Sequence, residues 1–399
     1  MNSGKKIKLG ELLYLCAFIP VVFCSFYDTT TFKALFDISN IYMCVRVYML
    51  VLIAAKCIYV DRYKLKELGV IAVIVLLGAL STITSQRAAL FEYIVLLIGT
   101  YKVDPKRIVK AYLAVSVPMM ICAFIASKTG LIIDYTIMRR GSDLVRHSFG
   151  IVYTTDFAAH IFYIVLAWLY VKKKKMNIWD LIIVLLVTYF IDRNCNARLS
   201  EGMLLIAGIL FYIYDHKKSF FESELFYKIV RVSGFIFTVI VFALANLYDV
   251  SNPLIVFIDE TFFNGRFYIA KKVIGMYGFS LFGQKIVMQG DGYKSYTYDS
   301  SIGTTYIDSA YLQVGLLYGL VFLLIILIAI SIYSKRCYIS GNTRLLLVIF
   351  LVLCSCLHNQ YLVLIAYNPF MVMMGGYIFT KRKKQVYRHL ETGVNGNKK

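Results

Sequence analysis

Long apolar runs recur along the whole chain, and short polar segments separate them. Many of these runs approach the roughly 17 to 25 residues that an α-helix needs to cross about 30 Å of hydrocarbon. The pattern predicts twelve membrane-crossing helices, of which the fourth and the eleventh are short. Their ranges are 11–27, 41–60, 68–84, 88–101, 108–127, 151–171, 177–191, 200–214, 229–248, 310–333, 344–357 and 361–380. The stretch 344–380 also fits a single re-entrant unit.

The composition agrees with a lipid environment. Hydrophobic residues make up 59% of the 399 positions and charged residues only 17%, so a water-soluble globule would expose a very large apolar surface. We therefore expect an all-α polytopic membrane protein of about 12 helices. Its expected parts are a bundle of about nine helices (1–248), an outer loop with an amphipathic helix (249–309), about three further helices (310–380) and a basic cytoplasmic tail (381–399).

Lysine and arginine are distributed unevenly between the two sides of this layout. If the N-terminus is cytoplasmic, 29 of them flank the helices on the inner side and 13 lie outside. This bias predicts a multi-pass protein with both termini in the cytoplasm. The net charge of +20 is then explained by contact with anionic lipid headgroups, and a nucleic-acid partner is not needed.

The cations on the short outer joints are mostly arginines, whereas lysine is more frequent on the inner side. Arginine binds phosphate oxygens through two parallel hydrogen bonds and stays charged in a partly dry site. The outer arginines therefore indicate a phosphate or pyrophosphate site, although each one alone also fits an anchor at the lipid headgroups. They are Arg87, Arg139, Arg140, Arg146, Arg193 and Arg198.

Several polar residues fall inside the predicted helices, at the depth of the outer leaflet. Asp156 and His160 are four positions apart and share one helix face, and Glu201 follows Arg198 by three positions. His358 and Asn359 lie at the outer end of the eleventh helix. Such residues are costly in hydrocarbon, so they indicate either a membrane-embedded active site or a hydrogen-bonded packing network.

The long outer segment contains an amphipathic helix that begins near Arg266. Its apolar positions recur at helical spacing and predict that it lies along the membrane surface or caps the bundle. These positions are Phe263, Phe267, Ala270, Ile274 and Tyr277. The segment then becomes rich in Gly, Tyr and Ser, a composition that suits sugar binding but is also ordinary for loops.

Five motifs, in this order, resemble the Wzy-type polysaccharide polymerases, which belong with the O-antigen ligases. The motifs are "RHSFG", "RNCNARLS", "NGRFYIAKK…LFGQ", "IDSAYLQVGLLYGL" and "HNQYLVLIAYNPF". The resemblance implies a metal-independent glycosyltransferase without a cofactor, built on a C-type glycosyltransferase-like bundle in the bacterial plasma (inner) membrane. The growing sugar chain would leave undecaprenyl pyrophosphate and join a hydroxyl of a new lipid-linked repeat unit.

The resemblance also implies roles for individual residues. Arg198 and Arg266 would bind the pyrophosphate, Arg146 would line the same cavity, and His358 would activate the acceptor hydroxyl. We expect the remaining substrate-binding residues to be Arg139, Arg140, Asp156, His160, Asp308, Tyr311 and Asn359. The expected partners are the lipid-linked oligosaccharide, the bilayer, and the flippase and chain-length regulator of the same pathway.

Two other functions fit parts of the pattern. An O-antigen-type ligase would share the fold and the donor but transfer the polymer to another acceptor. A flippase or other transporter of lipid-linked sugars would be expected to show internal repeats and charges at the membrane midplane in both halves, whereas the polar groups here gather on one side.

Overall fold

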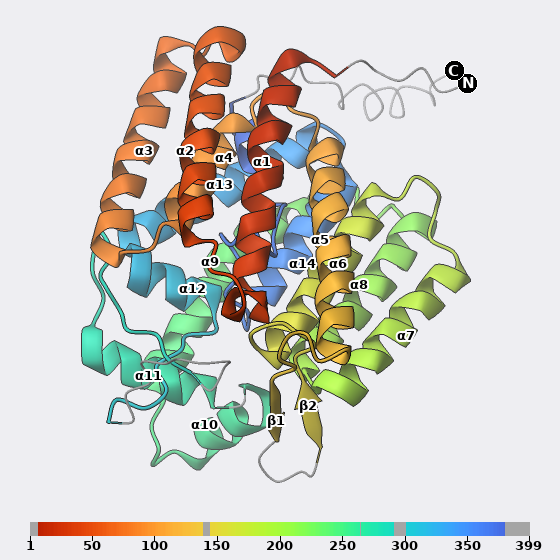
Figure 1. The fold of residues 1–399 in the computed structure, drawn as a ribbon, viewed down its shortest axis with the longest axis vertical. Helices are drawn as coiled ribbons and strands as arrows, with labels where there is room; N and C mark the ends of the chain where they lie inside the picture. The colour runs from red at the N-terminus through yellow and green to blue at the C-terminus, as the bar shows by residue number, and fades with distance from the viewer. Residues whose placement is uncertain (1–6, 139–143, 264, 291–300, 380–399) are drawn as a thin grey trace, which may run out of the picture.

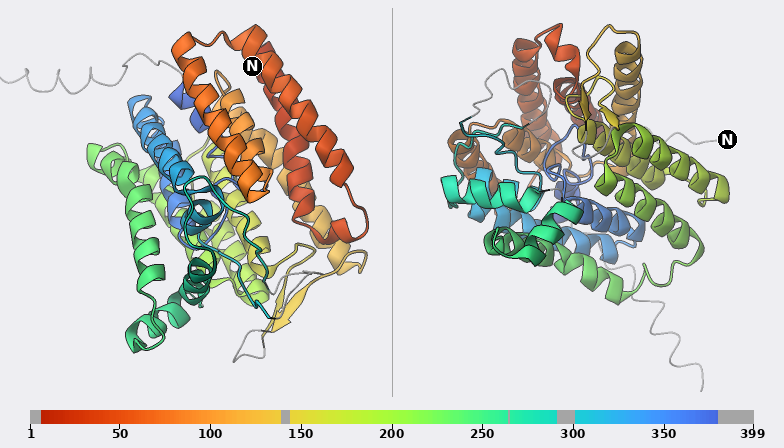
Figure 2. Two further views of the ribbon diagram at one scale, coloured as in Figure 1. Left: turned by 90° about the vertical axis from the view of Figure 1, so that its left-hand side faces the viewer. Right: turned by 90° about the horizontal axis from the view of Figure 1, so that it is seen from below.

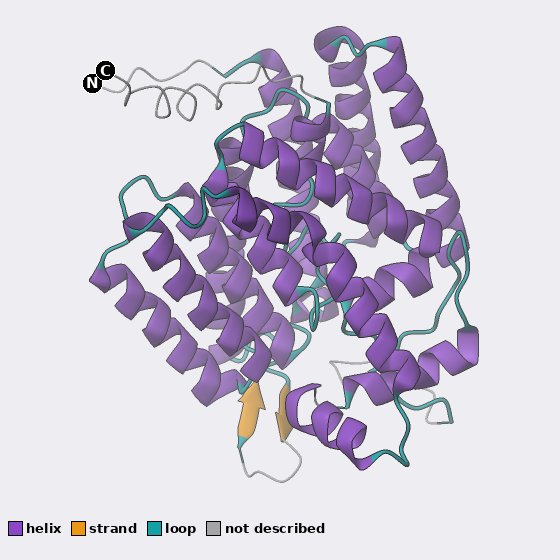
Figure 3. Ribbon diagram, turned by 180° about the vertical axis from the view of Figure 1, so that it is seen from behind, coloured by secondary structure: helices purple, strands orange, loops and turns teal. Residues whose placement is uncertain are grey.

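The computed structural model of the chain describes residues 7–138, 144–263, 265–290 and 301–379. Within these residues the protein is almost entirely helical, with one two-stranded hairpin, and seven helices are long and apolar enough to cross a membrane (Figure 3). These seven are α1 (Leu9–Asp28), α2 with a π-helical turn (Ser39–Asp61), α3 (Leu65–Ser85), α5 (Pro105–Lys128), α6 (Thr154–Val171), α9 (Glu224–Leu247) and α13 (Leu320–Ile339). The structure thus has the helical, apolar character expected of a membrane protein. The predicted basic tail, 381–399, lies outside the described ranges.

Four other predicted spans form shorter or more polar helices. α4 (Ala89–Gly99) and α14 (Thr343–Ser355) have 11 and 13 residues, which gives them lengths of only about 16 to 20 Å. Both are largely buried inside the bundle. α7 (Ile178–Cys195) and α8 (Arg198–His216) have 18 and 19 residues, but each carries charged residues near both ends.

The small irregular elements gather at one end of the bundle (Figures 1 and 2). They are β1 (Thr136–Met138), β2 (Val145–His147), α10 (Pro253–Ile258) and α11 (Arg266–Tyr277). We call this end, which is at the bottom of Figure 1, the loop end. Helix α1 begins at the opposite end.

The predicted helix 310–333 is interrupted at Gly319. It consists of α12 (Ala310–Gln313), a π-helical turn (Val314–Tyr318) and then α13. Gly319 has a φ of 96°, and a Cβ at this position would lie 2.4 Å from the carbonyl oxygen of Leu281, so only glycine fits. The first amides of α13 donate to the loop, Leu320 to the carbonyl of Ser280 at 3.0 Å. The break therefore holds the loop after α11 against the bundle.

The predicted helix 361–380 is wrong for most of its length. Only α15 (Met374–Ile378) is helical, and turns precede it. The Asn368 side chain bonds to the carbonyl of Tyr361 at 3.1 Å and to the amide of Phe370 at 3.0 Å, which replaces helical backbone bonds. Nearly all of this segment is buried, so the protein itself satisfies the irregular backbone. Within 343–379 the structure therefore has the 13-residue α14, buried turns and the five-residue α15.

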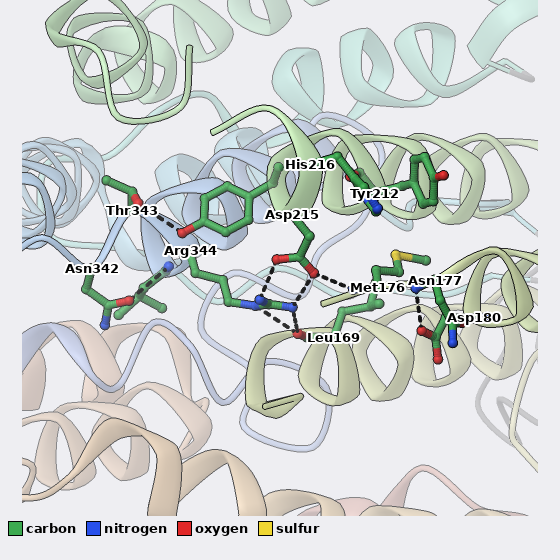
Figure 4. A network of polar contacts seen from close by, with 12 residues as sticks. Leu169, Met176, Asn177, Asp180, Tyr212, Asp215, His216, Asn342, Thr343 and Arg344 are labelled. Carbon is green, nitrogen blue, oxygen red and sulfur yellow. Dashed lines mark hydrogen bonds and ion pairs between the residues drawn. The ribbon is translucent and has the colours of Figure 1, made fainter. Parts of the chain in front are cut away.

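An ion pair joins three helices at the end opposite the loop end (Figure 4). Arg344, in the first turn of α14, donates to both carboxylate oxygens of Asp215 in α8, at 2.8 and 3.3 Å. Arg344 also donates to the carbonyl of Leu169 in α6 at 2.8 Å, and Asp215 accepts the amide of Met176 at 2.8 Å. The pair thus connects the last turns of α6 and α8 with the start of α14.

Candidate active site

Arg266 is the first residue of α11, and the turn before it sets its position. Gly265 adopts a left-handed conformation with a φ of 78°, which glycine tolerates best. The buried carboxylate of Asp259 accepts the amides of Phe267 at 3.0 Å and Tyr268 at 2.9 Å. Asp259 thereby satisfies two of the free N–H groups at the helix start, where negative charge is favourable.

The Arg266 side chain connects three segments that are distant in the sequence. Its Nε lies 2.8 Å from a carboxylate oxygen of Asp308, in the loop before α12. Its Nη1 donates to the backbone carbonyl of His358, just after α14, at 2.9 Å. Three residues predicted separately from the sequence therefore meet at one point. Burial raises the pKa of the Asp308 carboxyl, and the guanidinium of Arg266 partly offsets this effect.

Backbone and amide contacts hold the segments of Asp308 and His358 together. The amide of Ala310 lies 3.1 Å from the carbonyl oxygen of Cys356 and 3.2 Å from that of Asn359. The Gln313 side chain donates to Gln360 at 2.6 Å. Sequence reasoning did not single out these two glutamines, although Gln360 belongs to the polar "HNQY" run that signalled His358.

His358 and Asn359 have buried polar atoms without a partner in the structure. These atoms are Nε2 of His358 and Nδ2 of Asn359, and both residues are only 6% exposed. Burial, assisted by the charge of Arg266, lowers the pKa of His358 to about 3. The imidazole is therefore neutral at physiological pH, and the ring nitrogen without a hydrogen can accept a hydrogen bond. Orphaned buried groups of this kind call for a ligand or an ordered water.

A pocket lies beside the Arg266–Asp308 pair, and its walls are mainly apolar. Arg266, Asp308 and Ser309 supply its polar side. The apolar side is formed by Phe263, Phe267, Ala270, Ile307, Leu312 and Leu357. Three of the positions predicted for the apolar face of the amphipathic helix therefore line this pocket. The volume of the pocket is about 10 Å³, room for about one water, so any larger ligand needs the loop segment to move away from the bundle.

A second group of predicted residues lies at the start of α6. The Tyr361 hydroxyl donates to Asp156, and the Tyr361 ring stacks on Tyr367 with centroids 3.8 Å apart. Tyr367 in turn stacks on His160 at 3.9 Å. His160 is fully buried, and its Nε2 lies 2.9 Å from the hydroxyl of Thr29. The Nδ1 atom of His160 has no hydrogen-bond partner among the described residues, and Asp156 is partly buried.

A third group surrounds the joint between α7 and α8. Arg146 of β2 donates from Nε to the carbonyl of Cys195 at 2.6 Å. Arg198 is exposed at the first position of α8. Glu201 is buried, its Oε1 has no hydrogen-bond partner in the structure, and both arginines lie near enough to attract it electrostatically. Two predicted arginines thus share one acidic neighbour.

The other predicted residues lie apart from these groups. Tyr311 is fully buried, and its hydroxyl donates to the carbonyl of Leu353 at 2.8 Å. The Arg193 side chain is 62% exposed, 3.8 Å from the neighbouring Asp192. Two predicted arginines lie outside the described residues: Arg139 and Arg140.

The three groups share the loop end but are not joined into one contact network. Among the described residues, Arg266 contacts Asp308 and His358, whereas Arg198 lies near Glu201. Asp156 and Asp308 lie close enough to repel each other electrostatically, which places the first two groups near one another. Comparisons with protein families, curated proteins and solved structures found no match for this chain.

Proposed function

We propose that this chain polymerises lipid-linked oligosaccharides at the outer face of the bacterial plasma membrane. In the proposed layout the chain crosses the membrane twelve times, with both termini in the cytoplasm and the loop end outside. The long helices enclose the short crossings made by α4, α14 and the segment 359–378. The excess of cations on the opposite side, 29 against 13, supports this orientation.

The observation that carries the proposal is the position of Arg266 between Asp308, the His358 carbonyl and a mainly apolar pocket. A donor linked to undecaprenyl pyrophosphate has an anionic head and a long hydrocarbon chain. Arginine suits the head because its other N–H groups can bind phosphate oxygens while Nε and Nη1 keep their protein contacts. The apolar wall would face the first isoprene units once the loop segment has moved outward, because the pocket itself has a volume of only about 10 Å³.

The proposed glycosyl transfer needs a positive charge to stabilise the leaving pyrophosphate and groups that position the acceptor hydroxyl. The bond between the anomeric carbon and the pyrophosphate oxygen breaks, and the acceptor oxygen forms the new glycosidic bond. Arg266 stabilises the departing negative charge, and the acceptor proton passes to the neutral imidazole of His358. The bound pyrophosphate raises the proton affinity of this imidazole, because a nearby anion stabilises the imidazolium. Asp156, whose carboxylate accepts from the buried Tyr361 hydroxyl, contacts the sugars.

The α7–α8 joint supplies a second anion-binding point in this proposal. We assign Arg198 to the pyrophosphate of a substrate, because its guanidinium is exposed and makes none of the described hydrogen bonds or ion pairs. Arg146 and Glu201 define the polar surroundings of this position. Arg193 is assigned to the headgroup region, where it serves as an anchor.

Lysine should replace Arg193 but not Arg198. A lysine ammonium cannot form two parallel hydrogen bonds to phosphate oxygens, so Arg198→Lys is expected to lower polymer yield at least tenfold. Arg193→Lys, only five positions away, is the matched control and should polymerise normally. The measurement is the length distribution of the polysaccharide at equal membrane levels. If Arg198→Lys makes normal polymer and Arg193→Lys is inactive, Arg193 and not Arg198 binds the pyrophosphate.

A deletion strain tests the proposed function itself. Without the polymerase, cells should accumulate a single repeat unit on the lipid carrier, facing outward, as measured by mass spectrometry of extracted lipids. Accumulation of finished polymer on the lipid would indicate a ligase instead. Loss of outward-facing repeat units would indicate a flippase. Either of these two results contradicts the proposal.

A further inference from the structure

A groove lies between α9 and α13, two of the seven apolar helices, which pack side by side (Figure 2). Its volume is about 470 Å³, within the range of small-molecule sites. Its apolar lining consists of Val232, Phe235, Ile328 and Ile332, and its polar lining of Lys228, Arg231 and Ser331. None of these residues belongs to the candidate active site.

The polar part of the groove is a partly assembled anion site. Arg231 donates from Nε to the hydroxyl of Ser331 and from Nη1 to the hydroxyl of Tyr227, both at 3.2 Å. Among the described residues no carboxylate pairs with Arg231. Lys228 does have such a partner, Glu224 at 3.1 Å, but both of those side chains are more than 60% exposed. The groove therefore keeps an excess of positive charge.

The position of Arg231 along α9 separates this groove from the active site. Arg231 is seven residues from the start of α9, and Asn246 near the other end accepts a hydrogen bond from Lys271 of α11 at 2.6 Å. The fifteen residues between Arg231 and Asn246 correspond to about 22 Å of helix. Arg231 thus lies about 10 Å inside the end of α9 that is remote from the loop end.

A cation at this depth in an apolar helix is costly unless it binds something. Several residues around it are exposed and apolar, among them Val232, Ile328 and Ile332, so the groove faces the surrounding medium and not the protein core. The polar and the apolar lining of the groove lie next to each other, as the headgroup and the acyl chain of a lipid do.

We propose that this groove binds an anionic phospholipid of the adjoining leaflet, with its phosphate on Arg231 and Ser331 and an acyl chain along Val232 and Ile328. Arg231 favours an anionic over a zwitterionic headgroup, because its positive charge has no carboxylate partner among the described residues and repels the ammonium of phosphatidylcholine. Basic pockets between helices are a general way of holding anionic headgroups. The site does not depend on the proposed polymerase activity.

The test uses the purified full chain in detergent, with phosphatidylglycerol, phosphatidylcholine or undecaprenyl phosphate added, and native mass spectrometry to measure retained lipid. The wild type should retain phosphatidylglycerol in preference. Arg231→Gln should bind it about tenfold or more weakly, because it loses charge-assisted hydrogen bonds to the phosphate. Arg231→Lys should give an intermediate loss. Lys66→Gln removes an exposed cation from the start of α3 and should bind as the wild type does.

Three results would overturn the inference. They are unchanged phosphatidylglycerol binding in Arg231→Gln, equal retention of the two lipids by the wild type, and preferential retention of undecaprenyl phosphate. The last would assign the groove to the isoprenoid carrier. Size-exclusion profiles of the variants establish that they are folded. If Arg231→Gln does not fold, the weaker phosphatidylglycerol binding expected of Arg231→Lys tests the inference in its place.

Discussion

Replacing Arg266 with lysine or glutamine is expected to lower polymer formation by about 100-fold or more. Removing one preorganised group that stabilises developing negative charge commonly has an effect of this size. Lysine should not rescue the loss, because one ammonium cannot reach Asp308, the His358 carbonyl and a phosphate in the geometry of the guanidinium. The measurement is polymer yield in the deletion strain at matched membrane levels.

Lys271→Gln is the matched control for this experiment. Lys271 lies on the same helix, α11, but its ammonium bonds to the carbonyl of Asn246 instead of facing the pocket. This variant removes the same charge from the loop end and should polymerise normally. If Arg266→Gln also polymerises normally, the pyrophosphate site is elsewhere, most directly at Arg146 and Arg198.

Variants of Asp308 and His358, the two residues that Arg266 contacts, are compared with Arg266→Gln in the same polymer assay. Asp308→Asn should cost less than Arg266→Gln, because the His358 carbonyl still positions the guanidinium. His358→Ala keeps that carbonyl and removes only the imidazole. It should therefore lower turnover by about 100-fold or more while leaving donor binding largely intact. Equal losses of binding and turnover would make His358 a packing residue.

The apolar pattern located the helices well, because a chain in lipid must satisfy its backbone within each crossing segment. The predicted ranges 11–27 and 229–248 differ by only a few residues from α1 and α9. The apolar pattern predicted a helix wrongly in the segment 361–380, where an apolar sequence is buried by the protein without being helical. The segment 361–380 is apolar enough to be enclosed, but Asn368 and Pro369 favour turns, and the surrounding helices exclude lipid from its backbone.

The candidate site was predictable as a list of residues but not as an arrangement. Polar groups at the end of a predicted helix marked His358 and Asn359, whereas the family resemblance singled out Arg266. The contacts of Arg266 span 42 and 92 positions of sequence and depend on how the loop after α11 docks at Gly319, which hydropathy does not encode. The resemblance grouped Arg198 with Arg266, and in the structure Arg198 lies near Glu201, which Arg146 also approaches.

The Asp215–Arg344 pair was missed because its partners are 129 positions apart, and breaking it should have the largest effect on stability. The Asp215 side chain is 3% exposed and that of Arg344 16%. Asp215→Leu would leave Arg344 charged and without its partner, as well as freeing the amide of Met176. Loss of one partner from a buried pair typically costs about 3 to 5 kcal/mol.

The measurement is the free energy of unfolding in mixed micelles of increasing denaturing detergent. Asp215→Leu and Arg344→Met should each destabilise the protein by about 3 to 5 kcal/mol. The double variant should lose much less than the sum, because no uncompensated charge remains. Glu224→Gln breaks an exposed pair and should change stability by less than about 1 kcal/mol. Additive losses in the double variant would show that the two residues act independently, and small losses in both single variants would show that packing alone holds α6, α8 and α14 together.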